Sequence, residues 1–280
     1  MTAATCLLAQ LHTSFHAIAG RLFAGDLDRA TVFALLLNVR LSSGDTDRPI
    51  SINSAAMSLG RPFETVRRHV GTLIAQGLCR RDALGVRIAS DVCAQADLMQ
   101  AMDQIHDIVV RYVEDAVRAG LVTRPASGAP RAFDRADGVR TAIDIVLAMA
   151  DQHRTLIPIA TDLALVYGII AATADAADAP PGVARPRTVR VATLARLFSI
   201  AESTVRRRVA ALSRPGRPLI RTANGLAVAP EWMERLDAAV RQDGRHGTLA
   251  LGMGRIAAAG FPFADPASAY IAGRPALTFR

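Results

Sequence analysis

The chain has 280 residues and a formal net charge of +8, and 51% of its residues are hydrophobic, which is enough for a folded core and excludes a globally disordered chain. Its length fits about two domains, and its three cysteines form no CxxC pair, which argues against a disulfide framework or a zinc knuckle. No apolar run approaches the roughly 18 residues that span a bilayer, and the N-terminus lacks the basic segment of a signal peptide, so we expect a cytoplasmic protein.

The first half of the chain predicts helices followed by one hairpin. Apolar residues spaced three and four apart indicate helices, and short apolar runs beside turn residues indicate strands. The predicted elements are a helix at 7–22, a helix at 27–41, a strand at 50–52, a helix at 53–59, a helix at 63–76 and a hairpin with its turn at 82–85. Gly60 lies in the turn between the last two helices, and Ser90 is expected to cap the helix after the hairpin.

A long helix at about 91–121 carries apolar residues at alternating spacings of four and three. These residues are Leu98, Met102, Ile105, Val109, Tyr112, Ala116 and Ala119. This stripe either packs on its own chain or forms the seam of a homodimer. Packing on its own chain is favoured, because the stripe is single and short.

The second half repeats the same order of predicted elements. They are a helix at 134–152, a helix at 161–174, a strand at 189–191, a helix at 192–198, a helix at 202–213, a hairpin turning at Asn224-Gly225 and a helix from Pro230. Ser199 and Glu202 have the spacing of a capping box. Stretches rich in Pro, Gly and Ala at 123–131 and 175–187 read as linkers. The tail from Gly244, with Gly252-Met253-Gly254 as a flexible element, has no predicted structure.

The two halves of the chain also share an internal sequence repeat. When Ile50 is placed on Val189, ISINSAAMSLGRPFETVRRHVGTL (50–73) aligns without a gap with VRVATLARLFSIAESTVRRRVAAL (189–212), and seven of the 24 positions are identical. After a two-residue insertion, 78–80 matches 219–221, and 84–88 matches 224–228. Duplication is the simplest explanation.

Helix, turn, helix and hairpin in this order predict a winged helix-turn-helix. The stretch LGRPFETVRRHVGTLIAQGLCRRDALGVRI resembles the DNA-binding part of bacterial transcriptional regulators of the IclR, GntR and MarR types. The resemblance is confined to the two copies, and the second copy departs from it at Phe198-Ser199 and in its Pro-rich SRPGRPL stretch. It implies a mainly α fold with small β wings, in which two tandem units are joined by long helices. The expected domains are 1–122 with its core at 27–90, 131–243 with its core at 160–229, and a tail at 244–280 of unknown role.

Positive charge is concentrated on the two copies, and every basic residue is an arginine. Residues 48–90 contain seven Arg and two acidic residues, a net charge of +5, and residues 185–228 contain ten Arg and one acidic residue, a net charge of +9. The remaining chain has 16 Arg and 22 acidic residues, a net charge of −6. Codon bias alone would not sort the charge in this way, so the pattern favours nucleic-acid binding.

The longer helix of each copy has one apolar face and one polar face. Val66, Val70 and Leu73 are expected to point inward in the first copy, as are Val205, Val209 and Leu212 in the second. The polar face and the wing then supply the expected DNA contacts, which are Glu64, Thr65, Arg67, Arg68, Thr72, Arg80, Arg81, Arg87, Ser203, Thr204, Arg206, Arg207, Arg208, Arg217 and Arg221.

Each type of contact has its own chemistry. Arg68 and Arg207 are assigned to guanine or a nearby phosphate, whereas Glu64 can accept a hydrogen bond from a cytosine amine more selectively than Ser203 can. The two copies should therefore read related but unequal sequences. His69 lies at the edge of the apolar face, where packing is favoured over the alternative of a contact with DNA.

These patterns predict a sequence-specific double-stranded DNA-binding protein, a transcriptional regulator near the nucleoid. Two alternatives stay open: a plasmid or phage replication initiator, and a structural adaptor that binds protein, although the concentrated positive charge argues against the adaptor. No metal-ligand spacing, phosphate loop or nucleophile elbow occurs, so we expect no enzyme activity, cofactor or metal. No membrane partner is expected. The sequence marks no effector, and a homodimer through 91–121 is the other partner considered.

Overall fold

The computed structural model of the chain describes residues 1–42, 48–122, 132–177, 188–242 and 248–276. This part is mainly helical and contains two antiparallel hairpins of two strands each, which confirms the predicted class at this level. Within these ranges, no helix is both long enough and apolar enough to cross a membrane. The linker predicted at 123–131, and residues 178–187 of the second predicted linker, lie outside the described residues.

The first half follows the predicted order of elements. They are α1 (Ala3–Leu22), α2 (Leu27–Ser42), α3 (Ile52–Leu59), α4 (Phe63–Ala75), β1 (Cys79–Asp82), β2 (Gly85–Ile88) and α5 (Ala96–Arg118). The predicted strand at 50–52 is reduced to Ile50, which pairs with Val86 of β2, because Ser51 already caps α3. The prediction of Ser90 as the cap of the next helix is wrong: a 3-10 turn, Val92–Ala94, comes first, and α5 begins only at Ala96.

The second half repeats this order. It contains α6 (Arg135–Gln152), α7 (Ala160–Ala177), α8 (Val191–Leu197), α9 (Glu202–Leu212), β3 (Leu219–Thr222), β4 (Gly225–Val228) and α10 (Pro230–Gln242). The predicted capping box of Ser199 and Glu202 is wrong, because the N-cap of α9 is Ala201 and no side chain caps it. Ser199 instead adopts the left-handed backbone conformation with a φ of 55°, as Gly60 does at the aligned position with a φ of 58°. Both residues form the sharp turn between two helices.

The two copies, called here the first unit (residues 50–88) and the second unit (residues 189–228), match closely. Helices α3 and α4 align with α8 and α9 at one constant offset along the chain, and β1 and β2 align with β3 and β4 at an offset larger by one. Between its helices and its strands, the second unit therefore has one residue more than the first unit, not two more as predicted. The buried first strand residue is Cys79 in β1 and Leu219 in β3. Ile50 and Val189 each add one bridge to the second strand of their hairpin.

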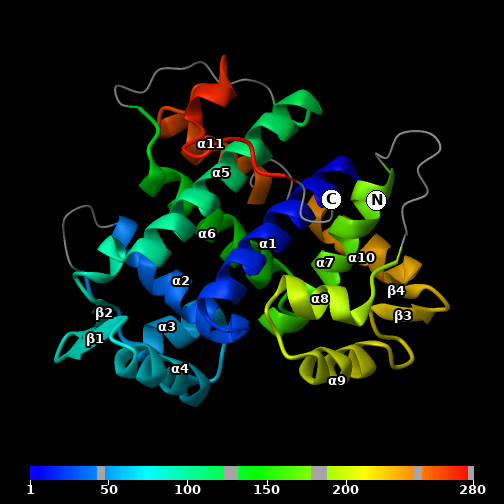
Figure 1. The fold of residues 1–280 in the computed structure, drawn as a ribbon, viewed down its shortest axis with the longest axis horizontal. Coiled ribbons are helices and arrows are strands. Elements are labelled where there is room, and N and C mark those ends of the chain that lie inside the picture. Colours follow the sequence, from blue (N-terminus) through cyan, green and yellow to red (C-terminus); the bar gives the residue numbers. More distant parts are fainter. Residues whose placement is uncertain (43–47, 123–131, 178–187, 243–247, 277–280) are drawn as a thin grey trace.

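The long helices of both halves form one continuous core above the two units (Figure 1). Helix α1 packs on α7 and α5, and α6 packs on α5 and α2. One cluster of buried apolar residues therefore extends from α1 through α7 into both units. The two halves share a core and are not packed as separate bodies.

The apolar stripe of α5 lies inside the chain. Leu98, Met102, Ile105, Val109, Tyr112 and Ala116 are buried, whereas Ala119 is exposed beyond the end of the helix. Because α5 packs on α1 and α6, this stripe is not available as a seam for a second copy. Of the two alternatives for the stripe, packing on its own chain is the one observed.

The tail is more ordered than the sequence predicted. Gly252, Met253 and Gly254 belong to a helix, α11 (Thr248–Ala258), so their description as a flexible element is wrong. Two glycines lower the intrinsic helix propensity, but α11 packs on α6 and buries Met253 and Ile256. Tertiary packing therefore outweighs the weak local preference.

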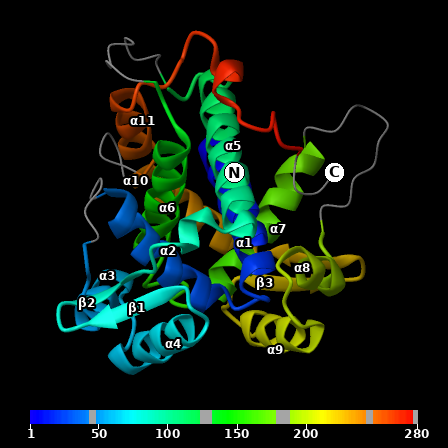
Figure 2. The ribbon, with the colours of Figure 1, turned by 60° about the vertical axis from the view of Figure 1, so that its left-hand side comes forward.

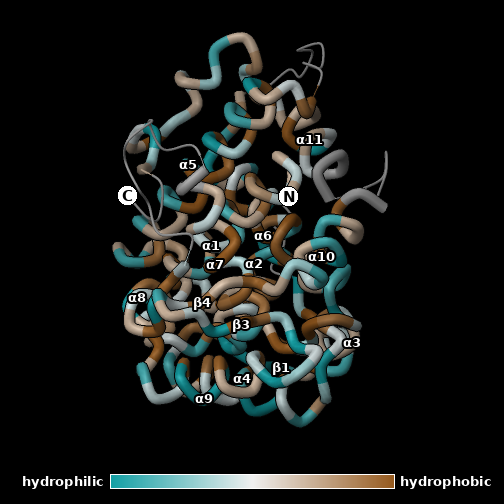
Figure 3. Tube along the Cα trace, turned by 90° about the vertical axis from the view of Figure 1, so that its right-hand side faces the viewer, coloured by the Kyte–Doolittle hydropathy of each residue, from teal (hydrophilic) through white to brown (hydrophobic). Residues whose placement is uncertain are grey.

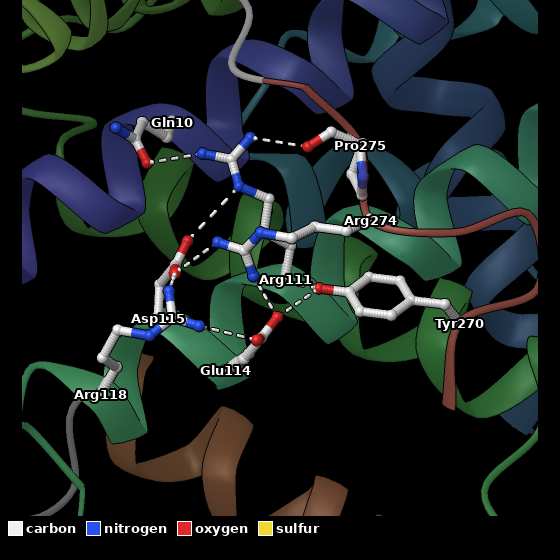
Figure 4. A network of polar contacts seen from close by, with 8 residues as sticks. All are labelled: Gln10, Arg111, Glu114, Asp115, Arg118, Tyr270, Arg274 and Pro275. Atoms are coloured by element: carbon white, nitrogen blue, oxygen red, sulfur yellow. Dashed lines mark hydrogen bonds and ion pairs between the residues drawn. The ribbon is translucent and has the colours of Figure 1, made fainter. Parts of the chain in front are cut away.

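After α11 the chain runs back along α5 and is held there by polar contacts (Figure 4). The Asp107 carboxylate accepts hydrogen bonds from the backbone N–H groups of Ile271 and Ala272, at 2.8 and 2.9 Å. The Tyr270 hydroxyl donates to Glu114 at 2.7 Å, and Arg274 pairs with the neighbouring carboxylates of α5. This segment fixes the C-terminal half of α5.

Candidate nucleic-acid interface

Apolar residues fix which face of α4 and of α9 looks outward. The buried residues of these faces are Val66, Val70 and Leu73 in α4 and Val205, Val209 and Leu212 in α9. All six were predicted to point inward, and burial confirms this. Because they recur every three or four residues, the opposite side of each helix faces solvent.

Two arginines of α4 lie on its outer face and differ in their surroundings. Arg67 donates two hydrogen bonds to the Glu64 carboxylate, at 2.6 and 2.7 Å, and these bonds lower the pKa of Glu64. Arg68 is exposed, and its guanidinium forms no hydrogen bond or ion pair with any residue that the structure describes. Arg68 therefore keeps all its donors for an outside partner. The contact predicted between Glu64 and a cytosine requires the Arg67 pair to open.

Helix α9 repeats this arrangement with a different acid. Arg206 donates to Glu202, at 3.0 Å from its Nε, although the residue aligned with Glu64 is Ser203. Arg207 is exposed like its counterpart Arg68, and within the described ranges it too has no hydrogen-bonding or ion-pairing partner. In both helices an acid in the first turn holds the first arginine and leaves the second one unpaired. Ser203 is exposed on the same helix.

The first turns of α4 and α9 have no side-chain cap. Their N-cap residues, Pro62 and Ala201, have no side-chain group that accepts a hydrogen bond from the helix. Thr65 and Thr204, which were predicted to hold phosphate, are half-buried in these turns. Uncapped N–H groups at a helix start favour an anion. Thr72, another predicted contact, turns its hydroxyl back to the carbonyl oxygen four residues earlier, at 3.2 Å.

The hairpins and the loop before β3 add further predicted arginines. Those that are exposed are Arg80, Arg81, Arg217 and Arg221. Arg87 differs, because only 13% of its side chain is exposed and its guanidinium pairs with Asp82 at the tip of the same hairpin. This pair joins the two strands of the first hairpin, so Arg87 is less accessible than its neighbours.

Arg208 and His69 occupy aligned positions and both face an acid of their own half. The Arg208 side chain is 25% exposed and donates to Asp162 of α7 at 3.0 Å. His69 is buried, and its Nδ1 lies 3.9 Å from Asp26, next to the start of α2. Arg208, predicted as a DNA contact, thus anchors α9 to the core. His69 packs at the edge of the apolar face, as expected.

Replacing Arg208 by alanine is expected to reduce the free energy of unfolding by about 1–3 kcal/mol, because it leaves the largely covered Asp162 carboxylate without its partner. Burial already raises the pKa of Asp162, and Arg208 opposes that rise. Arg207→Ala is the matched control, since its side chain is exposed and unpaired among the described residues. Urea unfolding of both variants measures the difference. Equal stability of the two variants would contradict the anchoring role.

Three exposed arginines of the second unit were not singled out from the sequence. Arg190 and Arg196 belong to α8 and its cap, and Arg214 follows α9. None of the three forms an ion pair with a residue of the described ranges. The net charge of +9 over residues 185–228 is the signal that could have found them.

Helices α4 and α9 lie at the same end of the molecule. Figure 1 shows both along the lower edge, with the long helices above them, and Figure 2 shows the same arrangement after a turn of 60°. Figure 3, turned by 90°, again has both at the base. The three views agree that the two arginine-bearing helices share one face.

The described residues contain no group of three His, Cys, Asp or Glu side chains that could hold a metal ion. Comparison with protein-family models, with curated proteins and with solved structures gives no match for this chain.

Proposed function

We propose that this chain is a transcriptional regulator that binds double-stranded DNA sequence-specifically, through two winged helix-turn-helix units. The observation that carries the proposal is the pair Arg68 and Arg207. Both are exposed and unpaired within the described chain, both stand at the same position of matching helices, and both helices share one face.

The charge of the two units supports a polyanionic partner. Within the two units, the other exposed arginines that form no ion pair with a described residue are Arg81, Arg190, Arg196, Arg214, Arg217 and Arg221. Arginine contacts phosphate and guanine through two parallel hydrogen bonds, so such a set is suited to a nucleic-acid backbone. The remainder of the chain, with a net charge of −6, is repelled by the same partner.

The shape of each unit supports duplex DNA as the polyanion. A major groove about 12 Å wide admits one helix, and residues on the first two turns of that helix reach the base edges. Arg68 of α4 and Arg207 of α9 are the sixth residues of their helices, on the second turn. In the proposed complex α4 and α9 enter the groove, their first turns bind phosphate, and the hairpins follow the adjacent backbone.

Arg68→Ala and Arg207→Ala are each expected to weaken binding to a selected duplex by about 1–3 kcal/mol, because each loses a bidentate contact to a base or phosphate. The duplex is first obtained by selection from random DNA, and fluorescence anisotropy then measures the dissociation constants. Arg118→Ala, which removes the same charge from α5 outside both units, is the control and should bind like the unchanged chain.

Two outcomes would count against this proposal. Wild-type affinity of both unit variants would refute the assignment of Arg68 and Arg207 to DNA. Absence of binding to any duplex at low salt would refute DNA binding itself and would favour a protein partner for the same face.

A further inference from the structure

The two halves contact each other in a reciprocal pattern. Helix α1 of the first half packs on α7 of the second, and α6, the counterpart of α1, packs on α2, the counterpart of α7. In the same way α5 packs on α6, and α10, the counterpart of α5, packs on α1. Exchanging the halves therefore maps each of these contacts onto another existing contact.

Two further contacts join elements to their own counterparts. Helix α1 touches α6, and α2 touches α7, where the Thr161 hydroxyl donates to Asp28 at 3.3 Å. Pairs of this kind lie on or near an axis of symmetry. Reciprocal contacts together with self-paired contacts are the property of an isologous, two-fold arrangement, whereas a head-to-tail arrangement produces neither.

The helix-turn-helix turns of the two units show the same reciprocal contacts between the halves. A Cβ atom on Gly25, between α1 and α2, would lie 2.3 Å from the carbonyl oxygen of Ser199 in the turn of the second unit. A Cβ atom on Gly60, in the turn of the first unit, would lie 2.3 Å from the Arg154 guanidinium, between α6 and α7. Each unit is thus held against the loop between the first two helices of the other half.

We infer that a single copy of this chain recognises an inverted pair of unequal half-sites in duplex DNA. This inference rests on the proposed function and adds the layout of the DNA site to it. A duplex has local two-fold axes perpendicular to its helix axis, so two reading helices related by a two-fold axis meet half-sites of inverted orientation. Because α4 and α9 share one face, both half-sites must lie on one side of the duplex, so their centres are separated by about 10 base pairs or a multiple of that spacing.

The half-sites are unequal because the two reading surfaces differ at aligned positions. Glu64 of α4 stands where α9 has Ser203. The first hairpin carries Arg80 and Arg87 where the second carries an exposed Ile220 and Ala227. Each first turn carries one paired acid, but the carboxylate is Glu64 in α4 and Glu202 in α9, so the acid lies one position further from the unpaired arginine in α9. The two units therefore present different donors and acceptors to their half-sites.

A second copy of the chain is not required for the arrangement. In a homodimeric regulator the reciprocal contacts join two chains, whereas here they join the two halves of one chain, with α1 against α6 and α2 against α7. The apolar stripe of α5, which was considered as the alternative seam of a homodimer, is buried inside the chain.

The test uses the full chain and a duplex selected from a random pool. We expect the selected site to be an imperfect inverted repeat that binds one chain, as measured by sedimentation of the complex. Three further duplexes are then made: one with two left halves, one with two right halves, and one with the same halves as a direct repeat. The direct repeat should bind about 10-fold or more weaker than the selected site, because only one unit can reach its half-site correctly.

Two variants then assign the halves. Arg68→Ala should lose about 5- to 150-fold in affinity and should no longer discriminate base changes in one half-site, while keeping its discrimination in the other. Arg207→Ala should do the reverse. Both side chains are exposed, and circular dichroism checks that both variants fold.

Several results would overturn the inference while leaving DNA binding intact. They are selection of a direct repeat or of a single half-site, two chains on each selected site, and loss of discrimination in both halves from one substitution. Absence of duplex binding at low salt would instead overturn the proposed function, and this inference with it.

Discussion

Raising the salt concentration from about 50 mM to about 200 mM is expected to weaken DNA binding by about 10³–10⁵-fold, if the arginines of both units neutralise six to ten phosphates. Each neutralised phosphate releases condensed counterions, and added salt opposes that release. Eight arginines of the two units are exposed and have no ion pair among the described residues, which matches this number of phosphates. Anisotropy titrations across the salt range give the slope of log K against log salt.

A double variant sharpens this prediction. Removing Arg190 and Arg214, which are exposed on the second unit, should make the slope shallower by about 0.9 for each phosphate that is no longer neutralised. Arg118→Ala on α5 should leave the slope unchanged, although it removes one positive charge. A slope near zero for the unchanged chain would contradict the electrostatic mode of binding.

Acid is expected to destabilise the fold strongly between about pH 6.5 and pH 4. His12 and His16 of α1 and His153 at the end of α6 are buried side by side with Tyr167, whose hydroxyl lies 3.0 Å from the Nε2 of His153. Burial lowers the pKa of His16 to about 4 and holds the pKa of His12 and His153 below the usual range. Below pH 6.5 the unfolded chain binds protons that the folded chain does not, so the free energy of unfolding decreases as the pH is lowered. His16 alone contributes about 3 kcal/mol to this loss.

The contribution of one histidine can be isolated. Within the described chain the Nδ1 of His12 has no hydrogen-bond partner, and its ring stacks on His16 and Tyr167, so phenylalanine fits the site without losing a hydrogen bond at that atom. The free energy of unfolding of His12→Phe should fall less steeply below pH 6.5, by up to about 1.4 kcal/mol per pH unit. Urea unfolding at about pH 7.5, 6 and 5, followed by the fluorescence of Trp232, the chain's one tryptophan, measures this slope. Identical slopes in both proteins would show that His12 does not stay neutral in the fold.

Local patterns predicted the local structure well. The spacing of Val66, Val70 and Leu73 correctly predicted the inner face of α4, because a helix that packs on a core repeats its apolar residues every 3.6 positions. Because the TVRR motif recurs in the second copy, the same spacing also correctly predicted the inner face of α9. Exposure of Arg68 and Arg207 follows from the same periodicity, as both lie opposite the apolar face.

Contacts between distant segments could not be read from these patterns. The pairing of Arg208 with Asp162 joins residues 46 positions apart, and the helix periodicity contains no information on that partner. Helix α11 escaped prediction because its glycines weaken the local signal and its packing on α6 supplies the stabilisation. The capping box at Ser199 failed for a similar reason, since that residue is needed for the tight turn against Gly25.

If the chain binds a paired DNA site as proposed, the shared core of its two halves determines how the second half-site is reached. Once one unit is bound, the fold itself sets the effective concentration of the other unit at the neighbouring half-site, typically in the millimolar range for closely linked modules. The amount of protein in the cell does not enter that second step, so occupancy rises with the first power of protein concentration and has no threshold for assembly. A substitution in one unit also alters one half-site alone, which leaves each reading helix free to change independently of the other.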